Sequence, residues 1–270
     1  STPKPSSAAS DVYKRQIFEI RKAGLNILMS MKGDKKPVAF IEDCAVTLDH
    51  LAEYTTKLKE IFKKYDTSGM FYAHASVGTL HVRPVLNMKS DKDINNMKKI
   101  AEEAFEMVKQ YKGSHSGEHG DGIVRSEFHE KMFGKKIINA FEDVKDTFDH
   151  KNLLNPNKIV RPYKSNDRSL MRYKADYKTE KISTHYDWSE WGQFSDAVEM
   201  CNNNGACRKL DSGVMCPSYR VTKEEKDLVR GRANTLRLAL SNQLPKGSFV
   251  SKEMYELSLI HISEPTRRSV

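Results

Sequence analysis

The sequence of 270 residues lacks any apolar run close to the ~18 residues that a membrane-spanning helix needs. It also begins without the charged and then apolar segment of a secretory signal peptide. Both absences favour a cytoplasmic protein as the default. Cysteine is scarce, with four residues in the chain, and a reducing cytoplasm disfavours disulfide bonds between them.

Basic residues outnumber acidic residues, but they form no stripe along the chain. The 45 lysines and arginines against 36 aspartates and glutamates give a net charge of +9. Because the positive charges are scattered, we expect no nucleic-acid partner, and the excess suits small anionic substrates equally well. The 38% of hydrophobic residues suffices for a packed core, so the sequence indicates a globular protein.

The two ends of the chain, residues 1–16 and 258–270, show no helical or strand periodicity. Both resemble translated adapter sequence at the ends of metagenomic gene fragments. We therefore treat them as non-native tails and exclude them from the fold prediction. The resulting expectation is that the chain is an interior piece of a longer protein.

Between these ends, strand-like and helical patterns alternate. The apolar stretches 38–46 and 70–86 predict strands, each followed by an amphipathic helix, and the second helix opens at Ser90 with Asp93 in capping-box spacing. A further helix is predicted from its apolar face, which comprises Phe128, Ile137, Phe141, Val144 and Phe148. This order predicts an α+β fold, with helices on one face of a mostly antiparallel sheet.

A polar stretch divides this region from the rest of the chain. Residues 161–187 are rich in lysine, tyrosine and aspartate and poor in periodicity, which predicts a linker. It would connect a first domain at 17–160 with a partial helical domain at 188–257. That second domain begins near Trp188 and contains the helical stretch RGRANTLRLALSNQL.

Three of the four cysteines gather in the segment CNNNGACRKLDSGVMCPSY, as Cys201, Cys207 and Cys216. Clustered thiols that end in a Cys-Pro step indicate a soft metal or an iron–sulfur cluster, whose fourth ligand would lie beyond the end of the chain. Two alternatives stay open: a zinc site, although no Cys-x-x-Cys spacing is present, and unrelated buried thiols. Cys44 lies in an apolar stretch and is predicted to be a core residue.

The stretch SHSGEHGDGIVR places titratable side chains among glycines. His74 and His81 are separated by Ser-Val-Gly, which can bend the chain so that both imidazoles converge. With Glu118 as an oxygen ligand they would hold a divalent metal with an open position, which leaves His119 as a general base. The alternative is that these are ordinary core or surface histidines. The remaining histidines are expected to be solvated: His50, His115, His129, His150 and His185.

Several motifs together resemble one known family. AHASVGTLHVRP, SGEHGDGIVRSEF and LLNPNKIVRP, in this order, resemble the C-terminal substrate domain of FAD-linked oxidases of the vanillyl-alcohol oxidase type. That group includes D-lactate and D-2-hydroxyglutarate dehydrogenases. CNNNGACRK and MCPSYRVTKEEKDLVRGRAN resemble the start of the iron–sulfur extension in its large bacterial members. The resemblance implies a ferredoxin-like antiparallel sheet with helices on one face, followed by a small all-α iron–sulfur domain.

The resemblance also implies roles for individual residues. His74, His81 and Glu118 match the ligands of a divalent metal such as zinc, and His119 matches the base that takes the hydroxyl proton while hydride passes to FAD. Arg21 is implied to pair with the substrate carboxylate. Cofactor contacts are implied for Asn155 near the flavin and for a 4Fe-4S cluster on Cys201, Cys207 and Cys216.

The implied reaction is the oxidation of a small D-2-hydroxy acid, with electrons passing through clusters to a quinone or an electron-carrier protein. The full-length protein would be cytoplasmic, with peripheral association at the inner face of the membrane. The chain reads SVGTLH where the family motif reads GDGNLH, and Arg83 replaces a polar ligand of some relatives, so metal identity and dependence stay open. The alternative from another class is a basic zinc-binding interaction module without catalytic activity.

Overall fold

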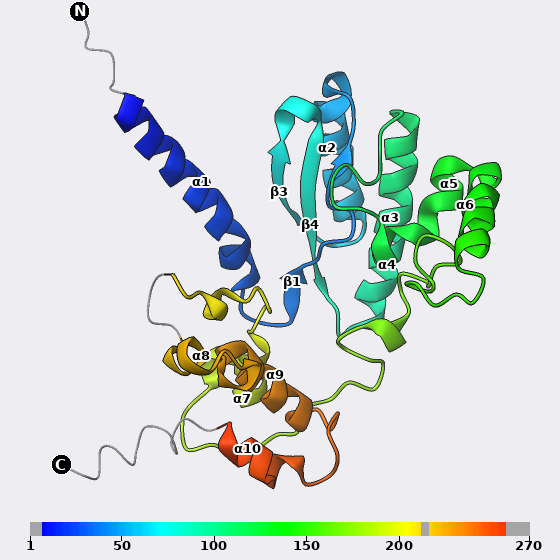
Figure 1. Cartoon of the computed structure of the whole chain (residues 1–270). Coiled ribbons are helices and arrows are strands. Elements are labelled where there is room, and N and C mark those ends of the chain that lie inside the picture. The colour runs from blue at the N-terminus through cyan, green and yellow to red at the C-terminus, as the bar shows by residue number, and fades with distance from the viewer. Residues whose placement is uncertain (1–6, 212–215, 258–270) are drawn as a thin grey trace, which may run out of the picture. The chain divides into compact units, whose positions relative to one another are not determined.

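The computed structural model describes residues 7–211 and 216–257, which belong to two compact units. Among these residues, one unit combines 7–33 with 177–211 and 216–257, and the other comprises 34–176. The chain is α+β, as predicted, because a small antiparallel sheet and several helices make up residues 34–176 (Figure 1). None of the helices in the described parts of the chain is long and apolar enough to cross a membrane.

The sheet of residues 34–176 is built around one central strand, β4 (Thr79–Asn87). It pairs antiparallel with β1 (Lys35–Pro37), β2 (Cys44–Ala45) and β3 (Gly69–His74). Alternate side chains of β4 point to opposite faces of the sheet. Leu80, Val82 and Leu86 enter the hydrophobic core, which places His81 on the other face.

Two long helices close the core against this sheet. They are α2 (Leu48–Lys64) and α3 (Asp91–Gln110), which run beside the strands in Figure 1. Their buried side chains recur with helical spacing, as the sequence pattern predicted. Cys44 is fully buried in the same core, which confirms its predicted role.

The predicted strand at 38–46 is wrong in its extent. Strand pairing occurs only in β1 and β2, and residues 38–43 between them form no strand. Phe40 and Ile41 are buried, which accounts for the apolar pattern. Asp43 has a left-handed backbone with φ of 64°, and a residue in that conformation interrupts an extended strand.

The predicted strand at 70–86 is two strands. β3 and β4 form an antiparallel hairpin through the short 3₁₀ turn η1 (Ala75–Val77), so the bend expected between His74 and His81 is present. Gly78 completes the turn with φ of 68°, and a Cβ there would lie 1.8 Å from the carbonyl oxygen of Val46. A larger residue would therefore displace the turn.

The predicted helix after residue 125 is broken into pieces. They are α4 (Gly122–Arg125), η2 (Ser126–Phe128), α5 (His129–Phe133) and α6 (Lys135–Phe148). Gly134, with φ of 82°, separates the last two. The expected apolar face packs only in part: Phe128 is buried, whereas the face of α6 stays 36–83% exposed at Ile137, Phe141, Val144 and Phe148. Periodicity predicted this helix, but nothing in the described chain buries its apolar side.

The predicted linker at 161–187 is not a separate segment. Residues up to Asp176 belong to the compact unit 34–176, and those from Tyr177 onward belong to the other unit. Arg168, in the 3₁₀ turn η3 (Arg168–Leu170), bonds Asp91 at 2.6 Å, and the backbone N–H of Ser165 donates to Glu127 at 2.7 Å. These polar contacts hold a segment that has little apolar periodicity of its own.

Glu127 makes the stability of residues 34–176 sensitive to acid. Burial raises its pKa, but hydrogen bonds from Lys98 and from Ser165 outweigh burial and lower the pKa from 4.5 to about 2. The stabilisation is present above pH 4.5 and is lost as the pH falls toward 2. This carboxylate should make the free energy of unfolding about 2 kcal/mol higher at pH 7 than at pH 3. We expect Glu127→Gln to abolish that difference.

Denaturant unfolding at both pH values measures this difference. Glu106→Gln, at an exposed position of α3, serves as the control. An unchanged pH dependence in Glu127→Gln would show that this carboxylate does not govern acid stability.

The other unit is helical in its described residues. It contains five helices there: α1 (Ser7–Met29), α7 (Phe194–Glu199), α8 (Pro217–Thr222), α9 (Val229–Leu240) and α10 (Lys252–Glu256). Short 3₁₀ turns occur at η4 (Ser189–Trp191), η5 (Ala206–Arg208), η6 (Glu225–Asp227) and η7 (Ser248–Val250).

The N-terminal stretch departs from the prediction, because residues 7–16 are helical within α1. Ion pairs at i,i+3 spacing, Lys14 with Asp11 and Lys22 with Glu19, support this helix. Apolar residues from Val12 to Ile20 stay at least 55% exposed. The helix therefore buries no apolar face here, and the sequence lacks the apolar periodicity that such a face produces. The predicted tail at 258–270 lies outside the described residues.

Candidate active site

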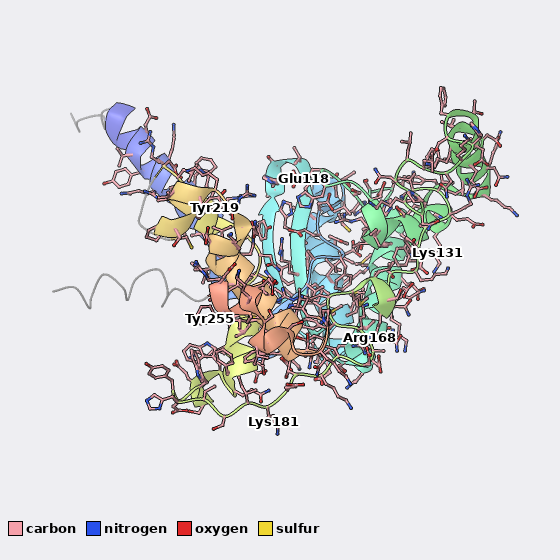
Figure 2. All side chains as sticks on the ribbon, turned by 60° about the horizontal axis from the view of Figure 1, so that its bottom comes forward. Glu118, Lys131, Arg168, Lys181, Tyr219 and Tyr255 are labelled. Atoms are coloured by element: carbon pink, nitrogen blue, oxygen red, sulfur yellow. The ribbon has the colours of Figure 1, made fainter. Side chains whose placement is uncertain are left out.

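Four predicted site residues come together on the sheet face opposite α2 and α3. His74 ends β3, His81 lies in β4, and Glu118 and His119 belong to the loop after α3; Figure 2 shows Glu118 next to the hairpin. The Oε1 atom of Glu118 lies 2.8 Å from Nε2 of His81, 3.6 Å from Nε2 of His74 and 3.5 Å from Nε2 of His119. One carboxylate oxygen is thus surrounded by three imidazoles.

The cluster has a closed side and an open side. The side chain of His81 is 3% exposed, whereas those of His74, Glu118 and His119 are 41–46% exposed. Burial is the main cause that lowers the pKa of His81 below 6.5, so its imidazole is neutral at neutral pH and has a lone pair to offer. The three side chains on the open side are accessible to solvent.

The residues present fit a divalent metal ion. Ligand atoms of His74, His81 and Glu118 all lie within 4.8 Å of one another. Two imidazoles with one carboxylate form a donor set that suits zinc or a related ion and leaves positions for substrate. These are the three residues that the sequence analysis predicted as metal ligands, and that role stays a prediction.

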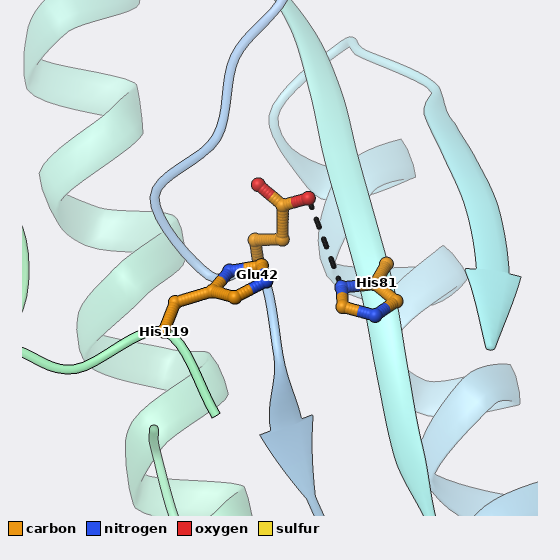
Figure 3. Close-up of side chains that lie close together, drawn as sticks. All are labelled: Glu42, His81 and His119. Atoms are coloured by element: carbon orange, nitrogen blue, oxygen red, sulfur yellow. Dashed lines mark ion pairs between the residues drawn. The ribbon is translucent and has the colours of Figure 1, made fainter. Parts of the chain in front are cut away.

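Glu42 lies on the other side of His81 and was missed by the sequence analysis. Its Oε1 is 3.7 Å from Nδ1 of His81, and Figure 3 shows both side chains beside His119. Arg83 holds the Glu42 carboxylate through Nη2 at 2.7 and 2.9 Å, and the Tyr72 hydroxyl donates to it at 2.9 Å. Nδ1 of His81 has no hydrogen-bond partner among the described residues, so the effect of Glu42 on His81 is that of a nearby negative charge.

Asp43 and Arg125 anchor the loop. Oδ2 of Asp43 accepts from the backbone N–H of Glu118 at 2.9 Å and of His119 at 2.6 Å. Its Oδ1 pairs with Arg125 at 2.6 Å, and Arg125 also donates to the carbonyl of Gly120 at 2.7 Å. Asp43 is fully buried and Arg125 is 7% exposed. Each charge is therefore stabilised by the other, and removal of either would leave its partner buried without a counter-charge. The sequence did contain a signal for these residues, because two adjacent acids occur in the apolar run FIEDCAV. Acids in a buried run need charged or hydrogen-bonding partners, so they indicate a polar contact within the fold.

Two further predicted residues lie outside this cluster. Asn155 is exposed in the turn after α6, where its side chain accepts from Lys158 at 3.3 Å and its backbone has φ of 47°. Arg21 is an exposed residue of α1, which belongs to the other compact unit. The flavin contact of Asn155 and the substrate contact of Arg21 therefore stay predictions.

The three clustered cysteines lie in the helical unit. Cys207 and Cys216 are buried beside Tyr219 and Leu228, whereas Cys201 is partly exposed. Within residues 7–211 and 216–257, no three ligand atoms that include a thiol lie within 4.8 Å of one another. The iron–sulfur cluster stays a prediction, and the zinc-binding interaction module has no supporting thiol group in these ranges.

The expectation that the remaining histidines are solvated is wrong for two of them. His115 and His129 are 1% and 2% exposed, because they pack among Phe105, Phe128 and Phe133. His150 and His185 are exposed, as expected. The sequence around His115 and His129 has no apolar periodicity from which their burial could have been predicted.

Residues 6–159 match the family "FAD linked oxidases, C-terminal domain". Among curated proteins, the D-2-hydroxyglutarate dehydrogenase of Pantoea ananatis is 32% identical over 248 residues, which cover 90% of this chain and 24% of that protein. The D-2-hydroxyglutarate dehydrogenase of Escherichia coli is 33% identical over 223 residues, 82% of this chain and 22% of the relative.

A more distant similarity covers less of the chain. The D-lactate dehydrogenase of Archaeoglobus fulgidus is 30% identical over 157 residues, 58% of this chain and 34% of that protein. The chain thus spans between a fifth and about a third of the length of these relatives.

Proposed function

Because this chain belongs to the family of FAD linked oxidases, whose C-terminal domain it matches, we propose that it supplies the substrate-binding part of a D-2-hydroxy acid dehydrogenase. The observation that carries the proposal is the convergence of three imidazoles on the Glu118 carboxylate, with one side buried and one side open. Bound FAD supplies the hydride acceptor in such a reaction, and a divalent ion supplies positive charge that acidifies the substrate hydroxyl.

In this proposal each residue of the cluster has a defined role. His74, His81 and Glu118 would hold the ion, and Nε2 of His119 would accept the hydroxyl proton as hydride leaves the carbinol carbon. The products would be a 2-oxo acid, a flavin that has gained the hydride and a protonated imidazole, so electrons and protons balance. Asp43 fixes the backbone of the two loop residues, which keeps the base in place relative to the ion.

The extent of the similarities favours the D-2-hydroxyglutarate class over the D-lactate class. The match to the Pantoea ananatis protein covers 90% of the chain and so continues past residue 159 into the helical unit, whereas the match to the Archaeoglobus fulgidus protein covers 58%. We propose that this unit begins an iron–sulfur domain at 188–257, with Cys201, Cys207 and Cys216 as ligands of a 4Fe-4S cluster.

The remaining assignments follow from the same proposal. Asn155 would contact the flavin and Arg21 would bind the substrate carboxylate. The substrate domain would be ferredoxin-like. Electrons would pass to a quinone or a carrier protein, with the full-length enzyme in the cytoplasm at the inner face of the membrane.

The test uses the full-length protein, recovered by extending the gene sequence past both ends of this chain. We expect a purified flavoprotein whose flavin absorbance is bleached by D-2-hydroxyglutarate, with a kcat/KM at least tenfold higher than for D-lactate, and not by L-2-hydroxyglutarate. Absence of an FAD-binding domain in the longer gene would contradict the proposal, as would reduction by the L-enantiomer alone.

A further inference from the structure

A second group of metal-ligating side chains lies beside the active-site loop and takes no part in the proposed reaction. His115 and Asp121 lie in the loop between α3 and α4, and His129 begins α5. We propose that these three residues form a buried binding site for a divalent metal ion such as zinc, separate from the cluster around Glu118. This inference does not depend on the proposed function.

The distances within the group match those between ligands of one metal ion. Nε2 of His115 is 3.3 Å from Oδ1 of Asp121, and Nε2 of His129 is 3.1 Å from Oδ2. Tetrahedral zinc with bonds of about 2.0 Å places its ligand atoms about 3.3 Å apart. All three residues offer ligand atoms within 4.8 Å of one another.

Hydrogen bonding does not account for the group. All four ring nitrogens of His115 and His129, and Oδ1 of Asp121, are buried without a hydrogen-bond partner among the described residues. The short N···O approaches therefore lack the alignment that an N–H donor needs. Buried polar atoms are almost always satisfied. A metal ion would take one nitrogen of each imidazole and one carboxylate oxygen, and so would satisfy three of these five atoms.

The surroundings of His115 are aromatic. Phe105 and Phe133 pack edge-to-face with its imidazole at centroid distances of 5.4 and 5.5 Å. Arg125 and Asp43 both act on His115, but their charges neutralise each other in an ion pair.

The group lies close to the surface on one side. The side chain of Asp121 is 24% exposed, whereas those of His115 and His129 are 2% and 3% exposed. An ion would reach the two imidazoles past this carboxylate. Once bound, it would tie the end of the loop that carries Glu118 and His119 to α5.

Metal stoichiometry of the 270-residue chain tests the proposal. The parent protein carries serine at three cysteines, so that zinc on thiols is not counted: Cys201→Ser, Cys207→Ser and Cys216→Ser. After chelator treatment, each protein is dialysed against Zn²⁺ and its bound zinc is measured by atomic emission. Asp121→Asn keeps the shape of the proposed ligand and removes its charge, and His81→Gln is the matched change in the other cluster.

We expect two equivalents of zinc in the parent and one in each variant. The parent could instead bind a single equivalent of zinc. If Asp121→Asn loses that zinc and His81→Gln keeps it, the result supports the site at Asp121 and counts against a metal at the cluster around Glu118. If the parent binds a single equivalent that Asp121→Asn keeps and His81→Gln loses, the site at Asp121 is overturned. A parent that binds no zinc would overturn it as well.

Folding is checked separately, because a buried substitution can unfold the loop. Circular dichroism of each metal-free variant should match that of the parent, and His129→Gln replaces Asp121→Asn if the latter does not fold. Zinc should raise the Tm of the parent more than that of Asp121→Asn, because the variant lacks one of the two sites. A zinc-induced Tm shift in Asp121→Asn as large as that of the parent would contradict a site at Asp121.

Discussion

Replacement of His119 by alanine is expected to lower kcat of the full-length enzyme by about 10²- to 10⁴-fold, the usual contribution of a general base. Nε2 of His119 lies 3.5 Å from the Glu118 carboxylate, on the open side of the cluster, where a substrate hydroxyl would bind. Since proton acceptance develops in the transition state, kcat and kcat/KM should fall together. Steady-state kinetics with D-2-hydroxyglutarate measures both.

The control for this variant is His50→Ala. His50 is 45% exposed, close to the 43% of His119, and it stacks on Tyr111 at a ring-centroid distance of 4.7 Å. It should leave kcat unchanged. Zinc content and Tm should stay at wild-type values in His119→Ala, because the predicted ligands are untouched. Full turnover in His119→Ala would remove the assigned role.

Replacement of Asp43 by asparagine is expected to cost about 3–5 kcal/mol of stability, the usual effect of leaving one partner of a buried ion pair uncompensated. Asparagine tolerates the left-handed backbone that Asp43 adopts, so the loss reports the charge and not backbone strain. Arg125 would remain buried without its counter-charge, and the loop amides of Glu118 and His119 would lose an anionic acceptor. Denaturant unfolding of the chain measures the change.

Asp34→Asn provides the matched control, since Asp34 pairs with Lys89 at 2.7 Å but is 44% exposed. An exposed pair of this kind contributes about 0–1 kcal/mol. If Asp43→Asn is no more destabilising than Asp34→Asn, the Asp43–Arg125 pair does not anchor the loop. In a double-mutant cycle, Arg125→Met should cost less in the Asp43→Asn background than in the wild type.

Much of the candidate site could be predicted because its residues occur in short local motifs. His74 and His81 flank a bend that Ser-Val-Gly permits, and Glu118 and His119 adjoin glycines that allow a tight loop. The helices α2 and α3 were equally accessible, since their buried positions repeat with the helical period. Local chemistry and local periodicity can be recognised without knowledge of distant contacts.

Other features depended on contacts between distant segments and could not be predicted. Asp43 lies in an apolar run that favours a strand, and only the loop amides and Arg125 reveal why a carboxylate is buried there. His115 and His129 carry no periodic signal and are buried by aromatic residues from α3 and α5.

The sequence by itself thus determined the α+β class and, through the resemblance of its short motifs to a known family, the residues of the candidate site: His74, His81, Glu118 and His119. Their convergence on one sheet face is a tertiary contact between the hairpin and the loop after α3. The tertiary structure decided which charges are buried, where the strands end and that α6 keeps an exposed apolar face. The physical reason is that burial is a property of packing, and packing joins residues whose distance along the chain is unrelated to their distance in space.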